Sequence, residues 1–263
     1  MITFKLNGKE VQGEEGQTIL EIARKYGVDI PTLCYHEALE PAGMCRLCTV
    51  ELFDGRKTRF VTACNYPIWE GMEVNTDTEA VHQGRKLIVE LLLARCPDVQ
   101  VIKKLAAQYD IKEPRFKKED DDCILCGLCV RVCQEVIGAN AIGFVNRGTS
   151  REVNTPYEIQ SDVCIGCGAC AYLCPTGAIK IEDTATHLVL DTWHTQLEKK
   201  ECSRCGNLFI PVAQLHLLKE KLKLDQAKFL DMCPSCRRKT IQEKLSKIGT
   251  KPVKFQNLES IIS

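Results

Sequence analysis

The chain has 263 residues, 44% of them hydrophobic and 27% charged, which is enough for two or three small domains with buried cores. Lys plus Arg and Asp plus Glu number 35 each, so the net charge gives no reason to expect nucleic acid or a membrane as partner. The first residues lack the basic start and apolar core of a secretory signal, and the apolar runs are too short to span a bilayer. The 17 Cys favour a reducing compartment if they bind metal, so we expect a cytoplasmic protein.

Residues 1–76 are predicted to form a β-grasp ferredoxin-like domain. Asn7-Gly8 and Asp54-Gly55 are hairpin turn signals, each flanked by short runs of strand character. Between the hairpins, Thr18 is placed to cap a helix whose apolar positions share one face. Hairpin, helix, cysteine loop and hairpin are the parts of this fold.

The same segment carries the spacing C-x10-C-x2-C-x15-C, which fits a [2Fe–2S] cluster within a ferredoxin fold. Gly43 would let the loop approach the cluster closely, so that backbone amides hydrogen-bond its sulfides. A zinc site is the alternative. His36 is interpreted as a surface or supporting residue, because a Rieske arrangement needs two Cys–His pairs. The ligands of this predicted two-iron site are Cys34, Cys45, Cys48 and Cys64.

Residues 77–118 are predicted to be a helical linker. Val81, Leu87, Ile88, Leu91 and Leu92 make one apolar stripe, and a second stripe follows. The second stripe consists of Val99, Ile102, Leu105 and Ala106, in a helix that Pro97 is expected to open.

Residues 119–190 contain two runs of the form C-x2-C-x2-C-x3-C and are predicted to be a two-cluster [4Fe–4S] ferredoxin domain, with a hairpin inserted at 141–160. In paired runs the fourth Cys ligates the cluster of the other run. Zinc sites and disulfide frameworks do not use this doubled spacing. The first cubane site is therefore expected on Cys123, Cys126, Cys129 and Cys174. The second cubane site is expected on Cys164, Cys167, Cys170 and Cys133.

Residues 198–245 are predicted to be a small four-cysteine module resembling a zinc ribbon, with a helix over 212–224. Two CxxC pairs give tight turns that direct four thiolates at one tetrahedral metal. We expect Zn²⁺ here, with a further iron–sulfur cluster or a redox disulfide pair as alternatives. The ligands of this C-terminal site are Cys202, Cys205, Cys233 and Cys236.

The whole chain is thus of the α+β class, with one [2Fe–2S] cluster, two [4Fe–4S] clusters and one zinc ion expected. It contains no GxGxxG, GxxxxGK[ST] or HExxH motif. We therefore expect no complete active site and no catalytic residue on this chain. Iron–sulfur clusters carry single electrons, so a two-electron donor would have to sit on another subunit.

The motifs Pro31-Thr-Leu-Cys-Tyr-His, Cys45-Arg-Leu-Cys and Thr62-Ala-Cys, with both cubane runs, carry a family resemblance over about residues 1–190. This part resembles the N-terminal region of the large iron–sulfur subunit of respiratory complex I. It is also similar to the diaphorase iron–sulfur subunit of NAD-linked nickel–iron hydrogenases and to the iron–sulfur subunits of electron-bifurcating hydrogenases and transhydrogenases.

The chain departs from that family at one point. The family usually has a further [4Fe–4S] site, ligated by one His and three Cys, after the first linker helix. Here only Cys96 lies between that helix and Cys123, so we expect this site to be missing. Cys96 is interpreted as a small buried residue and His82 as a structural one.

The resemblance implies an electron-transfer subunit that relays electrons between a partner flavin and ferredoxin or another catalytic subunit. The implied partners are an NAD(P)-binding flavoprotein and a thioredoxin-like [2Fe–2S] subunit in a soluble complex, of an electron-bifurcating transhydrogenase or hydrogenase type. The alternatives are a free-standing multi-cluster electron carrier and a redox-sensing zinc and iron–sulfur regulatory protein. Such carriers are usually small and acidic, and a nucleic-acid-binding regulator would show a basic stripe.

Overall fold

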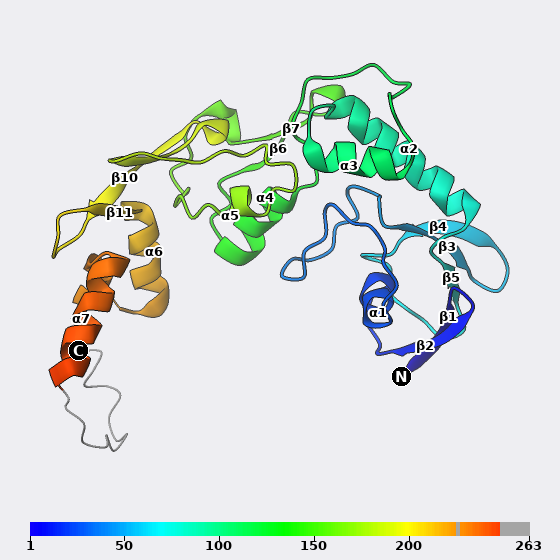
Figure 1. Ribbon diagram of the computed structural model, residues 1–263, viewed down its shortest axis with the longest axis horizontal. Coiled ribbons are helices and arrows are strands. Elements are labelled where there is room, and N and C mark those ends of the chain that lie inside the picture. Colours follow the sequence, from blue (N-terminus) through cyan, green and yellow to red (C-terminus); the bar gives the residue numbers. More distant parts are fainter. Residues whose placement is uncertain (225–226, 248–263) are drawn as a thin grey trace. The chain divides into compact units, whose positions relative to one another are not determined.

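A computed structural model describes residues 1–224 and 227–247 (Figure 1). The chain divides into two compact units. Unit 1 comprises residues 1–153 and 169–179, and unit 2 comprises residues 154–168 together with the described part of 180–263. Among the described helices, none combines the length and the apolar character that crossing a bilayer requires.

Unit 1 begins with a five-stranded sheet in the order β2-β1-β5-β3-β4. Antiparallel β1 and β2 form the first predicted hairpin, and antiparallel β3 and β4 form the second. The short strand β5 joins them, parallel to β1 and antiparallel to β3. The strands are β1 (Ile2–Leu6), β2 (Lys9–Gly13), β3 (Thr49–Phe53), β4 (Thr58–Thr62) and β5 (Glu73–Asn75).

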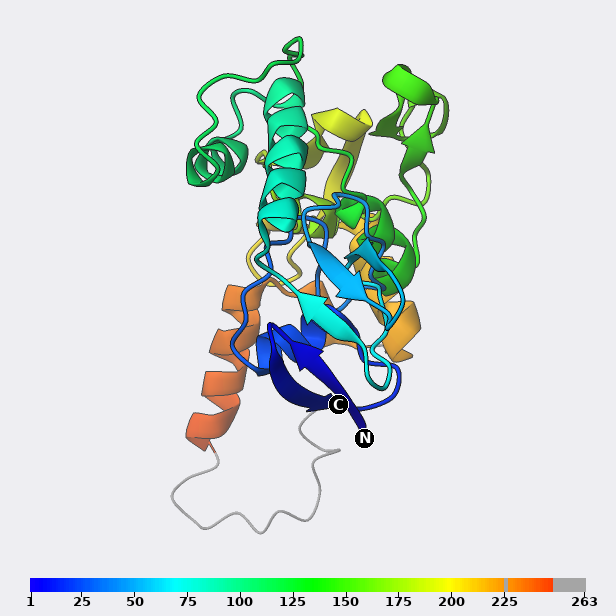
Figure 2. The ribbon, with the colours of Figure 1, turned by 90° about the vertical axis from the view of Figure 1, so that its right-hand side faces the viewer.

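Helix α1 (Ile19–Lys25) packs its buried apolar residues into the core of this sheet. Thr18 caps it as predicted: its hydroxyl accepts from the backbone N–H of Glu21, and Glu21 accepts from the backbone N–H of Thr18. The helix ends at Lys25. Gly27 follows shortly after it with a φ of 72°, a left-handed conformation that favours glycine. The sheet, α1 and the long helix that follows can be compared in Figure 2.

Helices α2 (Glu79–Arg95) and α3 (Gln100–Gln108) form the predicted linker, but the buried face of α2 differs from the prediction. Leu87 and Leu91 are 43% and 47% exposed. Arg85 takes a buried place instead, because its guanidinium donates to the carbonyl oxygen of Thr49 at 2.8 and 3.0 Å. Helix α3 begins three residues after Pro97 rather than at it.

The rest of unit 1 consists of short elements around the first cubane run. Helix α4 (Leu128–Arg131) continues into a π-helical turn at Val132–Ile137, and α5 (Ala169–Tyr172) follows later in the chain. The inserted hairpin is present as β6 (Gly143–Val145) and β7 (Glu152–Asn154). A short 3₁₀ turn at Gly148–Ser150 precedes β7, and another at Pro156–Glu158, in unit 2, follows it.

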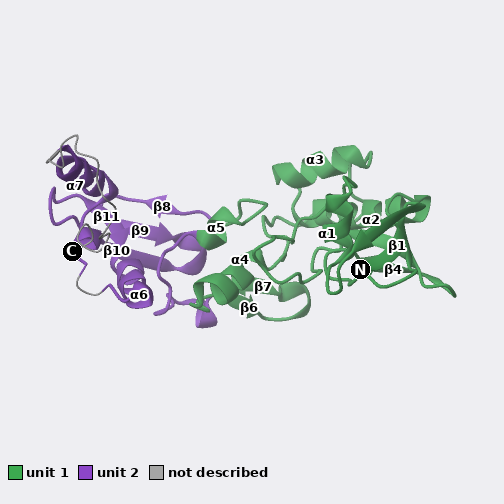
Figure 3. Ribbon diagram, turned by 90° about the horizontal axis from the view of Figure 1, so that it is seen from below, with its two compact units in different colours: residues 1–153, 169–179 green, residues 154–168, 180–263 purple. Residues whose placement is uncertain are grey.

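Unit 2, drawn in purple in Figure 3, contains a four-stranded sheet in the order β11-β10-β9-β8. The segment after Leu190, which belongs to neither predicted domain at its start, contains strand β10, which pairs with β9 on one side and β11 on the other. The sheet thus continues across the interval between the two predicted C-terminal domains. Its strands are β8 (Glu182–Asp183), β9 (His187–Leu190), β10 (Thr195–Glu201) and β11 (Leu208–Pro211).

Two helices complete the described part of unit 2. Helix α6 (Val212–Leu222) occupies the predicted helical segment, and Leu215 is its buried residue. Helix α7 (Pro234–Lys247) begins inside the second CxxC pair. Short 3₁₀ turns lie at Asp191–Trp193 and Lys228–Asp231. The tail from Gly249, for which the sequence suggested no chemistry, lies outside the described residues.

Candidate iron–sulfur and metal sites

The fold brings the four thiols of the predicted two-iron site together beside β3 and β4. Cys48 directly precedes β3 and Cys64 lies two residues after the end of β4, while the other two lie on the loop between α1 and β3. All four are buried. The loop passes close to the chain after β4, because a Cβ on Gly43 would meet the side chains of Asn65 and Thr62 at 3.0 and 3.2 Å. Gly43 therefore packs tightly against these side chains, and its predicted approach to a cluster stays a prediction.

These thiols form two hydrogen-bonded pairs. The pKa of Cys45 falls to about 6 and that of Cys34 rises, in both cases chiefly because the two side chains share a hydrogen bond. Cys48 and Cys64 make a second pair of the same kind, in which the pKa of Cys48 is lowered and that of Cys64 is raised. A [2Fe–2S] cluster takes four thiolates. Each of its two irons would receive one of these pairs, so the residues fit the group.

The four predicted ligands of the first cubane site all belong to unit 1. Burial raises the pKa of Cys126 to about 11, and negative charge on Cys123 and Cys174 acts in the same direction. Burial also raises the pKa of Cys123, to which Cys174 again contributes. Cys174, from the second run, therefore lies among the thiols of the first. This is the placement that crossed ligation needs.

Arg95 and Asp121 fix the backbone of Cys123. The Nε of Arg95 donates to the carbonyl oxygen of Cys123 at 2.7 Å, and its Nη2 donates to Asp121 at 2.6 Å. Asp121 in turn accepts the backbone N–H of Cys123 at 2.8 Å. Sequence reasoning missed both residues, because neither belongs to a ligand motif.

The predicted ligands of the second cubane site are divided between the two units. In unit 1, the Sγ of Cys133 accepts the backbone N–H of Ala141 at 3.3 Å. In unit 2, the loop with Cys164 and Cys167 packs on the sheet through Gly166, where a Cβ would meet Leu197 at 2.7 Å. The ligand set of this site stays a prediction.

One buried core of unit 1 contains some of the thiols of both predicted sites, whereas Cys48 and Cys64 belong to the core of the β-sheet. This core contains Cys34 and Cys45 together with Cys126. The charge on Cys45 is one of the causes that raise the pKa of Cys126, after burial and the nearer thiols. A Cβ on Gly127 would also come within 3.8 Å of Met44. The two predicted cluster sites are therefore neighbours.

The C-terminal site brings its four thiols close enough for a single metal ion. Their sulfur atoms all lie within 4.8 Å of one another, and the Sγ atoms of Cys205 and Cys233 are 3.8 Å apart. The pKa of Cys202 falls to about 6, chiefly because the backbone N–H of Cys233 donates to its sulfur at 3.2 Å. Burial raises the pKa of Cys236 to about 12.

Three residues were interpreted from the sequence as non-ligands. Each is buried, packed or hydrogen-bonded within the protein. Cys96 is fully buried at the end of α2, and burial raises its pKa to about 12. The ring of His82 packs against Tyr109 with centroids 5.1 Å apart. The Nδ1 of His36 accepts the backbone N–H of Ala38 at 3.2 Å.

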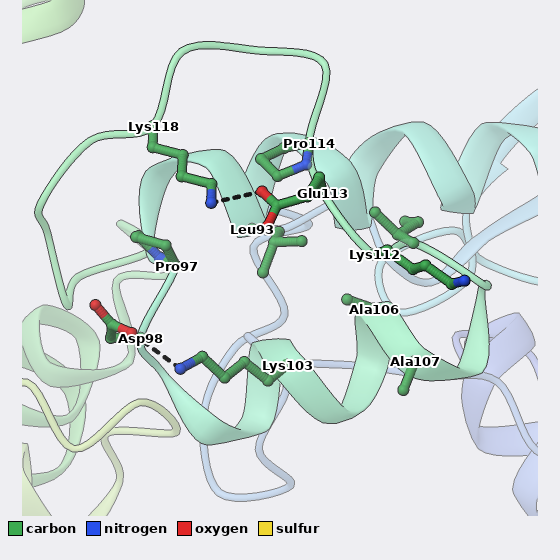
Figure 4. A pocket seen from close by; sticks show the side chains of 11 residues that line it. Leu93, Pro97, Asp98, Lys103, Ala106, Ala107, Lys112, Glu113, Pro114 and Lys118 are labelled. Carbon is green, nitrogen blue, oxygen red and sulfur yellow. Dashed lines mark hydrogen bonds and ion pairs between the residues drawn. The ribbon is translucent and has the colours of Figure 1, made fainter.

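A cavity of about 460 Å³ lies between α2, α3 and the loop after α3 (Figure 4). Ion pairs join Lys103 to Asp98 and Lys118 to Glu113 along its wall. No Cys or His is among the described residues that line it.

Comparisons with known proteins agree with the two cluster-binding regions. Residues 1–79 match a 2Fe–2S iron–sulfur cluster binding domain, and residues 122–178 match a 4Fe–4S dicluster domain. The NAD⁺-reducing [NiFe]-hydrogenase, solved in its H₂-reduced state, contains a chain of similar fold. The TM-score is 0.58 at 24% identity, and the match covers 84% of this chain and 97% of that chain.

Several curated proteins are similar in sequence. NADPH-Fe(3+) oxidoreductase subunit alpha of Geobacter sulfurreducens is 34% identical over 206 residues, which is 68% of this chain and 24% of that protein. NADP-reducing hydrogenase subunit HndD of Solidesulfovibrio fructosivorans is 33% identical over 211 residues, which is 68% of this chain and 36% of that protein. The mitochondrial NADH-ubiquinone oxidoreductase 78 kDa subunit of Candida albicans is 32% identical over 207 residues, which is 68% of this chain and 28% of that protein.

The chain thus spans between 24% and 36% of the length of these relatives. It contains a [2Fe–2S] cluster-binding domain and a [4Fe–4S] dicluster domain, and it is a homologue of subunits of NAD(P)-linked oxidoreductases and hydrogenases.

Proposed function

We propose that this chain is the iron–sulfur electron-transfer subunit of an NAD(P)-linked flavoprotein complex. The observation that carries the proposal is the buried core that contains Cys34 and Cys45 of the two-iron site together with Cys126 of the first cubane site. Clusters held at these positions would each carry one electron, and their closeness suits transfer between them. The chain's own residues hold the ligands, exclude water and set the surrounding charge.

The ligand sets follow from this proposal. A [2Fe–2S] cluster would bind the two thiol pairs, and [4Fe–4S] clusters would bind the two cubane sites. Zinc is the better fit at the C-terminal site, because tetrahedral Zn–S bonds of about 2.3 Å imply sulfur separations of about 3.8 Å. The Sγ atoms of Cys205 and Cys233 are separated by 3.8 Å. Thiolates on four different irons of a cubane would lie further apart.

The partners follow from what this chain does not itself supply. A hydride donor such as NADH or NADPH gives two electrons at once, so a flavin on another subunit would have to split them. We propose an NAD(P)-binding flavoprotein and a thioredoxin-like [2Fe–2S] subunit on one side, and ferredoxin or a further catalytic subunit on the other. A cytoplasmic complex of the electron-bifurcating transhydrogenase or hydrogenase type fits this set.

Anaerobic native purification from the source cells, with mass spectrometry of the co-eluting proteins, tests the proposal. A flavoprotein in fixed ratio to this chain is the expected result, and any further subunit would indicate the terminal donor or acceptor. Elution of the chain alone, with its full iron content, would contradict the complex and favour a free-standing carrier.

A further inference from the structure

The helix of the first cubane run holds the loop that carries the first two-iron ligand. The Nη2 of Arg131 donates to the carbonyl oxygen of Cys34 at 2.6 Å, and its Nη1 donates to the carbonyl oxygen of Glu40. The carboxylate of Glu135, one turn further on, accepts the backbone N–H of Glu40 at 2.9 Å. Residues from one short helical segment therefore satisfy both backbone groups of Glu40 and one of Cys34.

Arg131 is partly buried beside an apolar core. Its neighbours on the helix, Leu128 and Val132, are buried in the same core as Cys34 and Cys45. Its Nε is buried and makes no hydrogen bond with any described residue. A partly buried charge is screened less by water than a fully exposed one, so it acts on charged groups nearby.

We propose that Arg131 is a positioning residue for the predicted two-iron site and that its charge raises the reduction potential of that site. The inference rests on the proposed function, because it assumes a cluster on Cys34, Cys45, Cys48 and Cys64. With four thiolates, an oxidised [2Fe–2S] centre has a net charge of about −2, and it gains one electron and no proton on reduction to about −3. The nearby positive charge stabilises the reduced form more than the oxidised form.

Glu135 allows the charge effect to be separated from the effect of holding the loop. It holds the same loop, yet its charge has the opposite sign. If charge sets the potential, removing the charge of Arg131 and removing that of Glu135 should shift the potential in opposite directions. If both residues only hold the loop, both substitutions should loosen it and shift the potential the same way.

The experiment is a redox titration of the complete protein with dithionite and mediators, followed by the EPR signal of the reduced two-iron site. The variants are Arg131→Met, Arg131→Lys and Glu135→Gln. The control is Arg56→Met, an exposed arginine at the tip of the β3–β4 hairpin. Iron content and amide hydrogen exchange of residues 34–40 are measured on each variant.

For Arg131→Met we expect the ratio of reduced to oxidised centre at a fixed potential to fall about tenfold, equivalent to about 59 mV for one electron. Glu135→Gln should raise this ratio about twofold to threefold, less because its side chain is exposed. Arg131→Lys should stay within about threefold of the unmodified protein while exchange in the loop increases. Arg56→Met should change neither quantity.

Unchanged potentials in Arg131→Met and Glu135→Gln, or shifts of the same sign in both, would overturn the charge role. If Arg131→Met loses the two irons while Arg131→Lys keeps them, the result supports the need for a positive charge at this position. The direction of the shift in reduction potential is then read from Glu135→Gln. Absence of a two-iron signal from the unmodified protein would instead contradict the proposed function, so the two failures are distinguishable.

Discussion

Arg95 and Cys123 are joined by a hydrogen bond of 2.7 Å from the Nε of the arginine to the carbonyl oxygen of the cysteine. Asp121 closes the arrangement by accepting from both residues. The end of α2 thereby fixes the backbone of the first ligand in the first cubane run.

Arg95→Gln should make the first cubane site labile. Hydrogen bonds to charged groups contribute about 1.5–3 kcal/mol each, so we expect iron loss from this site to an added chelator to be about tenfold faster. The decay of visible absorbance under anaerobic conditions measures this rate. Lys103→Gln is the matched control, since its pair with Asp98 is exposed and worth little. Equal rates in both variants would show that Arg95 does not hold the site.

Cys96 and Cys48 should behave differently when substituted by alanine. Cys96→Ala should keep the full complement of about ten irons and lower the free energy of unfolding by about 1 kcal/mol, because it removes a buried side chain. Cys48→Ala should remove the [2Fe–2S] EPR signal and leave NAD(P)H reduction of the partner flavin intact. Iron analysis and EPR of both variants provide the check, and iron loss in Cys96→Ala would make it a ligand.

Metal analysis of the purified protein should find one zinc beside about ten irons. Cys236→Ser should remove the zinc and leave the iron unchanged, because the four thiols of the C-terminal site serve one metal. About fourteen irons without zinc would mean that this site holds a fourth cluster.

Gly166→Ala should destabilise the loop of the second cubane run. Its φ of +66° is unfavourable for alanine, and a Cβ would meet Leu197, Leu188 and Pro211 at 2.7–3.2 Å. Gly148→Ala is the matched control, with φ of +62° and no atom within 4 Å of the added Cβ. The first variant should lose about 1–3 kcal/mol more stability than the second, measured by thermal unfolding. Equal losses would show that the packing on the sheet is unimportant.

Glu90 should contribute stability with a defined pH dependence. Four hydrogen bonds from Arg115 lower its pKa from 4.5 to about 2. A lowered folded-state pKa means that the contribution is complete above about pH 4.5 and is lost as the pH falls toward 2. The difference in Tm between the unmodified protein and Glu90→Gln should therefore be constant from about pH 7 to 5 and shrink only below that. A difference that grows on acidification would contradict this.

Local signals in the sequence predicted the elements that depend on neighbouring residues. Thr18 and Glu21 form their capping box within one turn, and the glycine turns fix the hairpins. The cysteine spacings likewise indicate the thiol clusters, because each CxxC places two ligands on one loop. Helix α1 and both hairpins therefore agree with the prediction.

Features that depend on distant partners were not predictable. The apolar pattern of α2 favoured Leu87 and Leu91 as buried, whereas the carbonyl of Thr49 makes burial of Arg85 favourable instead. Strand β10 was missed because its sequence is polar, yet it is paired on both edges. Arg131 reaches a carbonyl 97 positions earlier in the chain, and no local pattern marks such a contact.

The position of β5 has a consequence for the order in which this protein is made. Strand β5 joins the two hairpins, and all four thiols of the predicted two-iron site precede it in the chain. Synthesis at about 5–20 residues per second leaves about 2–8 s between the addition of Cys34 and that of Asn75. The four thiols receive their complete sheet only after this interval, so we expect iron insertion to follow the completion of this domain.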